Sequence, residues 1–180
     1  ILMNLDESES PYASLVKASR ELAATQAQKA AGFLVARPAP SPEELALLAE
    51  AQLVEGNAGK ALATSKKLLA MEKSARASYL VARARALAGD RSAATRAFEE
   101  LIAANPRHAG GRLSLASLLL TGERSEASRI EQLLLPVTQD TRASRGEKAR
   151  AFALVGRAQL RSRNEKAAAA SFDKAKAIDS

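Results

Sequence analysis

The sequence predicts an all-α protein built from stacked helix pairs, and three observations support this fold class. First, 41 of the 180 residues are Ala and 25 are Leu, which are among the residues most favourable to helices. Second, only six residues are aromatic, so typical strand-forming residues are scarce. Third, glycine recurs at a constant interval, at Gly56, Gly89 and Gly122, and an alanine stands at the fifth position after each of them. A fixed period of this length is typical of helical-repeat arrays.

The composition also excludes several classes of protein. Apolar residues make up 47% of the chain and charged residues 26%, which is typical of a folded globular protein rather than a disordered one. No apolar run approaches the roughly 18 residues that a membrane-spanning helix needs. The chain contains no cysteine, so disulfides, thiolate metal sites and cysteine nucleophiles are excluded.

The sequence does not indicate a compartment. A protein without cysteine tolerates either redox environment. Because the chain begins at Ile1 rather than Met, we expect it to be part of a longer gene product, so a missing signal peptide carries no information about export. The high Ala and Arg content suits a GC-rich bacterial genome, and both the cytoplasm and the periplasm of a bacterium are compatible with it.

Residues 1–41 are expected to form an acidic leader followed by one long helix. Residues 4–10 are polar and acidic, and the Ser-Pro pair at their end is a typical helix start. Apolar residues recur at helical spacing from Tyr12 to about Val35, and three prolines within residues 38–42 end this helix. We expect the helix to cap the array. A mimic of a bound segment and a link to upstream domains are the alternatives.

Residues 42–180 are expected to form four repeat units. The similar stretches are 48–69, 81–102, 114–135 and 154–177, which place the units at about 42–74, 75–108, 109–141 and 149–180. The fourth unit is delayed by about seven residues. We expect the insertion near 136–147, where Pro136 is predicted to end a helix.

Each unit is predicted to be an antiparallel helix pair. The first helix runs to a glycine, which adopts the left-handed conformation that ends a helix at low cost. After about three polar residues the second helix begins, with alanine at its first inward position. Such a pair cannot bury its apolar face alone, so neighbouring pairs must stack. Small residues at fixed spacing allow this stacking, because bulky side chains there would force the pairs apart.

The stretch from Val81 to His108 resembles a tetratricopeptide repeat (TPR). The matching residues are Ala82, Gly89, Ala94, Phe98 and Pro106, and in the fourth unit Gly156, Ala168, Phe172 and Ala175 follow the same pattern. The resemblance covers about residues 42–180. It implies a curved α-solenoid in which the first helix of each pair lines the concave face.

Units one and three depart from the TPR pattern. Ser65 and Glu131 stand where the family has an aromatic residue, and Leu115 replaces the small residue of the first helix. Tryptophan is missing from the whole chain. A Sel1-like array or another α-solenoid is therefore the alternative to a TPR array.

No group of residues predicts catalysis or cofactor binding. The only histidine, His108, has no ligand or acid–base partner at suitable spacing, so we expect an exposed turn residue. Gly110 and Gly111 lack the lysine and the strand of a phosphate-binding loop and are expected to relax a turn. Glu43 and Glu44 follow a Ser-Pro pair and indicate a helix N-terminus. We predict a protein that is not an enzyme and binds no cofactor or metal.

A basic concave face is the predicted binding site. Basic residues exceed acidic ones by six to three in 75–108 and by ten to four in 141–180, within a net charge of +7. The resemblance places six residues toward the groove: Arg76, Tyr79, Arg83, Arg112, Arg150 and Arg157. Because guanidinium groups bind carboxylates in bidentate fashion, we predict a scaffold that binds an acidic segment of a partner protein. The alternatives are a solvated face and an ion pair between Arg83 and Glu50.

Other functions have weaker support in the sequence. Nucleic-acid binding is disfavoured, because aromatic residues are few and basic residues alternate with acidic ones. A membrane-surface role for residues 11–36 is disfavoured, because their polar face is not strongly basic. The clamp of chaperone-binding TPR proteins is not matched, since Ala46 and Glu50 occupy its positions. The alternative function is a structural module of a bacterial secretion, pilus or envelope complex, which joins subunits, including copies of itself, through its Ala-rich ends.

Overall fold

The computed structural model describes residue 25, residues 40–122 and residues 126–179. Within these residues the chain forms only helices: α2 (Pro42–Val54), α3 (Ala58–Met71), α4 (Ala75–Leu87), α5 (Arg91–Ala104), α6 (Ala109–Leu120), α7 (Ala127–Gln139), α8 (Arg145–Arg161) and α9 (Glu165–Asp179). The predicted all-α solenoid of helix pairs is confirmed. The predicted long helix from Tyr12 to about Val35 lies outside the described residues, apart from the helical Thr25.

Helix starts are specified by local capping residues. Ser41 caps α2 in a reciprocal pair: its Oγ accepts from the Glu44 amide at 3.3 Å, and the Glu44 carboxylate accepts from the Ser41 amide at 2.8 Å. Such caps satisfy amides that the first helical turn leaves without partners. The helix N-terminus predicted at Glu43 and Glu44 is therefore confirmed. Side chains of the same kind cap five further helices, at Asn57, Ser74, Asp90, Ser144 and Asn164.

Two of the three repeated glycines end helices as predicted. Gly56 and Gly89 have φ values of 77° and 78°, in the left-handed region that costs glycine little. The prediction is wrong for Gly122, whose φ lies outside that region. In the fourth pair a non-glycine residue, Arg163, takes the left-handed conformation with φ 60°.

Two arginines from neighbouring pairs hold the end of α6. Arg91, at the start of α5, donates to the Leu119 carbonyl at 3.3 Å and to the Thr121 hydroxyl at 2.6 Å. Arg161, at the end of α8, donates to the carbonyls of Leu120 and Gly122. Because these guanidinium groups satisfy the last carbonyls of α6, a left-handed glycine is not needed there.

Pro136 does not end a helix, contrary to prediction. It lies inside α7, which continues to Gln139. Proline removes one amide donor and crowds the carbonyl four residues earlier, but Pro136 lies in the last turn and is exposed. The turn is retained, because the Asp140 amide donates to the Pro136 carbonyl at 3.0 Å. The extra length of the fourth unit lies in the connection 140–144 and in α8, which has 17 residues against 12 in α6.

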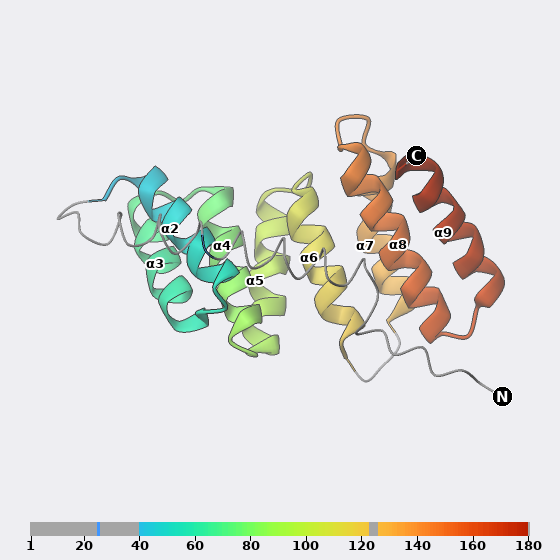
Figure 1. The fold of residues 1–180 in the computed structure, drawn as a ribbon, viewed down its shortest axis with the longest axis horizontal. Coiled ribbons are helices and arrows are strands. Elements are labelled where there is room, and N and C mark those ends of the chain that lie inside the picture. Colours follow the sequence, from blue (N-terminus) through green and yellow to red (C-terminus); the bar gives the residue numbers. More distant parts are fainter. Residues whose placement is uncertain (1–24, 26–39, 123–125, 180) are drawn as a thin grey trace.

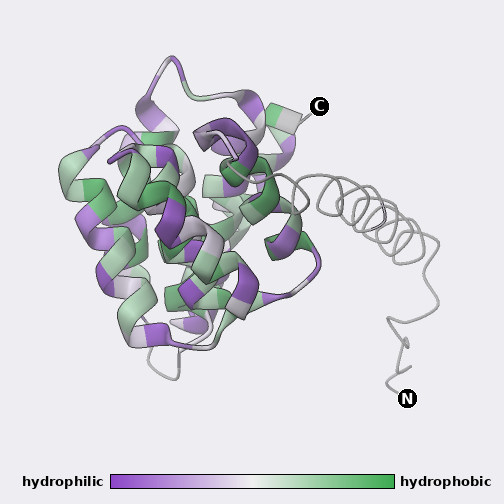
Figure 2. Cartoon of the chain, turned by 90° about the vertical axis from the view of Figure 1, so that its left-hand side faces the viewer, coloured by the Kyte–Doolittle hydropathy of each residue, from purple (hydrophilic) through white to green (hydrophobic). Residues whose placement is uncertain are grey.

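The helices stack in two layers along the long axis of the molecule (Figure 1). Each second helix contacts the first helix of the next pair, as in α3 with α4, and consecutive first helices α2, α4, α6 and α8 also touch one another. Figure 2 shows hydrophobic and hydrophilic residues alternating around the helices, as expected when one side of each helix is buried. The first helices therefore share one face.

Alanines at helix contacts make the close stacking possible. Ala61, Ala82 and Ala94 are fully buried, and Phe98 is only 1% exposed. At the corresponding contact of the fourth pair, a Cβ added to Gly156 would approach the Phe172 ring to 2.8 Å. Small residues therefore lie where the sequence predicts close helix packing.

Candidate functional site: a groove along the first helices

A cavity of about 420 Å³ opens along the face that the first helices share. Its lining residues come from α2, α4, α6 with its C-terminal cap, and α8, and one residue comes from α5. They are Leu53, Arg83, Ala86, Leu87, Phe98, Ser114, Ser117, Leu118, Thr121 and Arg150. We call this cavity the first-helix groove. Its walls combine apolar side chains, three hydroxyl groups and two guanidinium groups.

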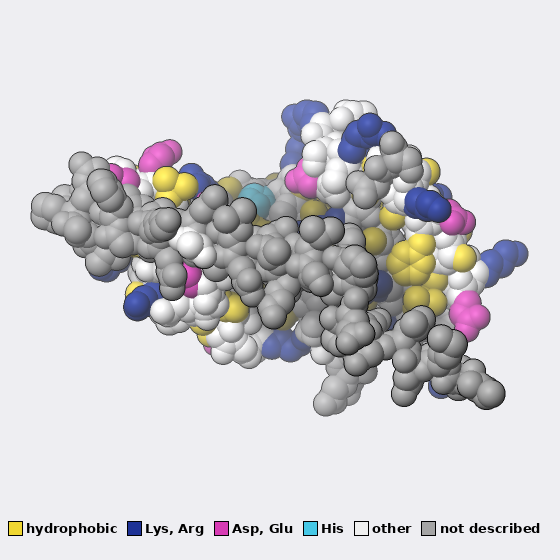
Figure 3. All heavy atoms as spheres, in the orientation of Figure 1, with side chains coloured by type: hydrophobic (Ala, Val, Ile, Leu, Met, Phe, Trp, Pro, Cys, Tyr) yellow, Lys and Arg dark blue, Asp and Glu magenta, His cyan; other side chains and the backbone are white. Residues whose placement is uncertain are grey.

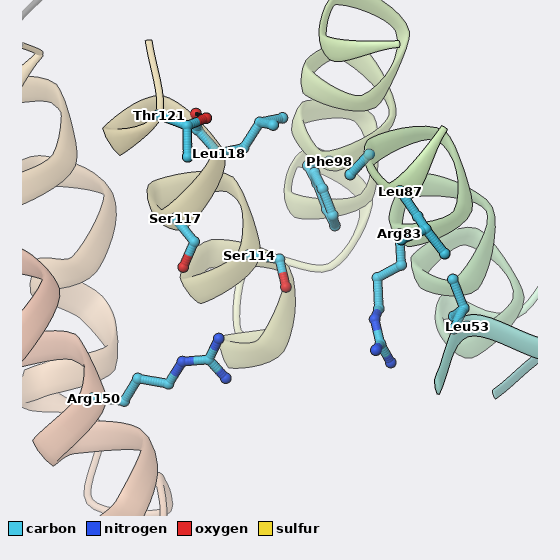
Figure 4. Close-up of a pocket in the computed structure, with 10 residues that line it drawn as sticks. Leu53, Arg83, Leu87, Phe98, Ser114, Ser117, Leu118, Thr121 and Arg150 are labelled. Carbon is cyan, nitrogen blue, oxygen red and sulfur yellow. Dashed lines mark hydrogen bonds between the residues drawn. The ribbon is translucent and has the colours of Figure 1, made fainter. Parts of the chain in front are cut away.

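Two of the predicted arginines line this groove, from opposite sides (Figure 4). Arg83 reaches in from α4 and Arg150 from α8, with Ser114 and Ser117 of α6 between them (Figure 4). Among the described residues neither arginine pairs with a carboxylate, and the Arg83 guanidinium carbon lies 5.6 Å from the centre of the Tyr79 ring. Contact with an aromatic face leaves the edge donors of a guanidinium group available. Both arginines can therefore donate hydrogen bonds to an anionic group that binds in the groove.

Tyr79 lies beside the groove and joins two first helices. Its hydroxyl is 3.1 Å from the Ser114 hydroxyl. Its ring centre is 6.2 Å from that of Phe98 and 5.1 Å from that of His108. Tyr79 therefore fixes α4 against α6 and supports Arg83 through its ring.

The remaining predicted arginines have other surroundings. The ion pair with Glu50 is made by Arg76, at 3.0 Å, rather than by Arg83 as the alternative supposed. Arg112 donates to the carbonyls of Pro106 and Leu133, and burial lowers the pKa of its guanidinium group. Arg157 is exposed on α8 and does not line the groove. The structure thus brings together Arg83, Arg150 and Tyr79 from the predicted set.

His108 is not the exposed turn residue that the sequence predicted. It is half-buried and caps α6, where its Nδ1 accepts from the Gly111 amide at 2.9 Å. Gly110 and Gly111 belong to the first turn of α6 rather than to the preceding turn. A Cβ on Gly111 would lie 3.1 Å from Leu101 and 3.2 Å from the His108 ring. These three residues therefore serve the packing of α6 against α5.

Sequence reasoning missed the serines and the apolar residues of the groove. Ser114, Ser117 and Leu118 on α6 and Thr121 at its C-terminal cap recur at spacings of three and one, so they share one helix face. This spacing is a usable signal, but the predicted site was chosen by positive charge on the first helices, which does not select serines or leucines. Figure 3 shows Lys and Arg side chains gathered at the α7–α9 end of the described surface, in agreement with the charge excess there.

Metal sites and membrane-spanning helices are both absent from the part of the chain that the structure describes. Residues 40–122 and 126–179 contain no group of three or more His, Asp or Glu side chains placed to hold a metal ion. Among the described helices, none has the length and apolar character needed to cross a membrane.

Comparison with known proteins supports the architecture. No protein-family model matches the sequence, and no curated protein matches it. Among solved structures, the crystal structure of MamA is similar, with a TM-score of 0.61 and 21% sequence identity over 99% of this chain and 96% of that chain. Similarity at this level of identity shows the fold alone. Together with the stacked helix pairs, it shows that this chain has a helical-repeat fold of the TPR type.

Proposed function

We propose that the protein is a non-enzymatic scaffold that holds an acidic segment of a partner protein in the first-helix groove. The observation that carries this proposal is the pairing of an apolar wall with two guanidinium groups that have no carboxylate partner among the described residues. A groove of this kind offers burial to apolar side chains and bidentate hydrogen bonds to carboxylates.

The groove geometry favours an extended or helical segment over a small metabolite. Four successive first helices contribute to the wall, so the contact surface runs along the stack rather than closing around one point. Leu53 and Leu87 supply apolar contact at one end, and Arg150 lies at the other. A ligand with an apolar side chain at one end and a carboxylate at the other can contact the leucines and Arg150 at the same time.

A catalytic role has less support in the groove. Acid–base catalysis needs a positioned acid and base within hydrogen-bond reach of the substrate. The lining contains arginines, which stay protonated, and the hydroxyl groups of Ser114, Ser117 and Thr121. No carboxylate and no imidazole belongs to the lining, so the side chains available there are suited to binding.

The proposal is tested with a labelled peptide that carries a central pair of leucines flanked by glutamates. We expect saturable binding by fluorescence anisotropy, and we expect Arg83→Glu with Arg150→Glu to weaken it by at least about tenfold, because attraction becomes repulsion. The matched control is Arg96→Glu, which makes the same charge change on an exposed residue of α5 outside the groove. Equal binding by the double variant, or equal binding of a peptide with lysines in place of glutamates, would refute the groove assignment.

An assembly module that joins subunits through the ends of the array is the second candidate. Ala169 and Ala170 are exposed on α9, the last described helix, and an exposed alanine face permits close approach of another helix. This function predicts a molar mass that rises with protein concentration in light scattering. A constant monomer mass up to high concentration would exclude self-assembly.

A further inference from the structure

A row of apolar side chains crosses the C-terminal ends of the first helices. Each first helix contributes one residue from its last turn: Val54 on α2, Leu87 on α4, Leu118 on α6 and Leu160 on α8. Val54, Leu87 and Leu160 are 48%, 42% and 48% exposed, and Leu118 is half-buried. We call these four residues the apolar row. Its two central members, Leu87 and Leu118, line the first-helix groove.

Repeat register places the two outer members of the apolar row on the same side of the stack. Val54 is the last residue of α2, as Leu87 is the last residue of α4. Leu160 is the second-last residue of α8, as Ala86 is of α4, and Ala86 lines the groove. Equivalent residues of stacked repeats face the same side of the array. The apolar row therefore continues the apolar wall of the groove toward both ends of the stack.

Arginines stand one helical turn before two members of the apolar row. Arg83 precedes Leu87 on α4, and Arg157 precedes Leu160 on α8. Side chains at this spacing share a helix face and lie about 5.4 Å apart along the axis. Figure 4 shows the Arg83 guanidinium group below Leu87 in that view. Positive charge therefore borders the apolar row on its groove side.

The other charged groups of the first helices do not cancel this positive charge. The Glu50 carboxylate of α2 is already paired with Arg76 at 3.0 Å. Neither Arg83, Arg150 nor Arg157 has a carboxylate partner among the described residues. An occupant that complements this surface needs an apolar stripe with carboxylates along one side of it.

The spacing of the apolar row fits a helical occupant better than an extended one. Packed helices lie about 8–10 Å apart, and consecutive first helices touch one another, so each member of the row is separated from the next by about this distance. Residues seven positions apart share one face of an α-helix and lie about 10.5 Å apart. Residues on one face of an extended segment lie about 6.6 or 13 Å apart. A helix can therefore place one apolar side chain opposite each first helix.

We propose that the partner segment binds as an amphipathic α-helix, with its apolar stripe on the apolar row and its glutamate or aspartate side chains toward Arg83, Arg150 and Arg157. A helix of about 20 residues is about 30 Å long, which is enough to cross four first helices. This inference rests on the proposed function and adds the conformation of the bound segment. It also assigns binding roles to Leu160 and Arg157, which lie outside the groove lining.

Two labelled peptides of equal composition test the conformation of the bound segment. The first, of about 20 residues, carries leucine at every third or fourth position and glutamates along one flank of that stripe. The second arranges the same residues in strict alternation, the pattern of an extended segment. We expect the first peptide to bind at least about tenfold more tightly in fluorescence anisotropy and to gain helical circular dichroism on binding. Equal binding of the two peptides, or binding of the first without a gain in helix, would overturn the inference.

A matched pair of leucine variants tests the apolar row itself. Leu160→Ser should weaken binding of the first peptide by about fivefold or more, because binding buries an exposed leucine. The control is Leu135→Ser, which changes a leucine that is 52% exposed on α7, outside the row. Equal effects of the two variants, with binding that still depends on Arg83 and Arg150, would overturn the helical inference and leave the proposed function standing. Absence of binding by either peptide would overturn both.

Discussion

The first two described pairs and the last two reach the same architecture by different local solutions. From α2 to α5 the repeat is regular, and helices end at the left-handed Gly56 and Gly89. From α6 to α9, Gly122 is not left-handed, Pro136 lies within α7, and α8 is extended to 17 residues. Both halves still stack each second helix on the next first helix. The stacking of helix pairs thus restricts which residues can occupy the buried contacts, but it restricts the turns between helices much less.

The largest expected difference in the free energy of unfolding is between variants of Phe98 and Phe172, which occupy equivalent positions in the second and fourth pairs. Phe98 is 1% exposed, whereas Phe172 at the end of the array is half-buried. We expect Phe98→Ala to lower the free energy of unfolding by about 3–5 kcal/mol and Phe172→Ala to lower it by less. Urea denaturation followed by circular dichroism measures both. Equal losses would show that the last pair is as tightly packed as the second.

A smaller effect is expected at the helix contact of the fourth pair. Gly156→Ala introduces a Cβ within 2.8 Å of the Phe172 ring, and such overpacking costs about 1–3 kcal/mol. The matched control is Gly146→Ala in the same helix, where a Cβ meets nothing within 4 Å. That change should stabilise by up to about 1 kcal/mol, since alanine favours helix over glycine. Thermal unfolding of both variants compares them, and stabilisation by Gly156→Ala would contradict the close contact.

The smallest expected effect is at the end of α6, where arginine hydrogen bonds take the place of a left-handed glycine. Arg91→Met keeps most of the side-chain length but removes the donors to Leu119 and Thr121. We expect a loss of about 1 kcal/mol, typical of a hydrogen bond that leaves its acceptor with access to water. Amide hydrogen exchange should quicken at the end of α6 while α2 and α3 keep their protection. Unchanged exchange at α6 would mean that Arg161 alone holds this helix end.

The sequence predicts the fold well because the signals of the fold are local or periodic. Glycine and alanine at fixed spacing indicate the helix pairs, and the Ser41 cap indicates the start of α2. Gly122 was mispredicted, because Arg91 and Arg161 come from distant parts of the chain and no local pattern places them at α6. Pro136 was mispredicted, because α7 continues for three residues beyond it and the Asp140 amide donates to its carbonyl, which the sequence pattern alone does not indicate.

The groove was only partly predictable for the same reason. Repeat register placed Arg83 and Arg150 on first helices, and the structure brings them to one cavity. Register could not show that Arg76 pairs with Glu50 or that Arg112 binds backbone carbonyls. It also gave no sign that His108 caps α6. Such assignments depend on side-chain geometry between helices, which a linear pattern does not contain.

The end of α6 is a point where side chains from both the preceding and the following helix pair bind the same short stretch of backbone. Arg91 belongs to the pair before it and Arg161 to the pair after it, and both bind the stretch 119–122. Loss of either neighbour therefore exposes carbonyls of the pair between them. In an array whose units interact mainly with adjacent units, such a three-way junction raises cooperativity. We expect the centre of this protein to unfold as one block, while its outer pairs fray.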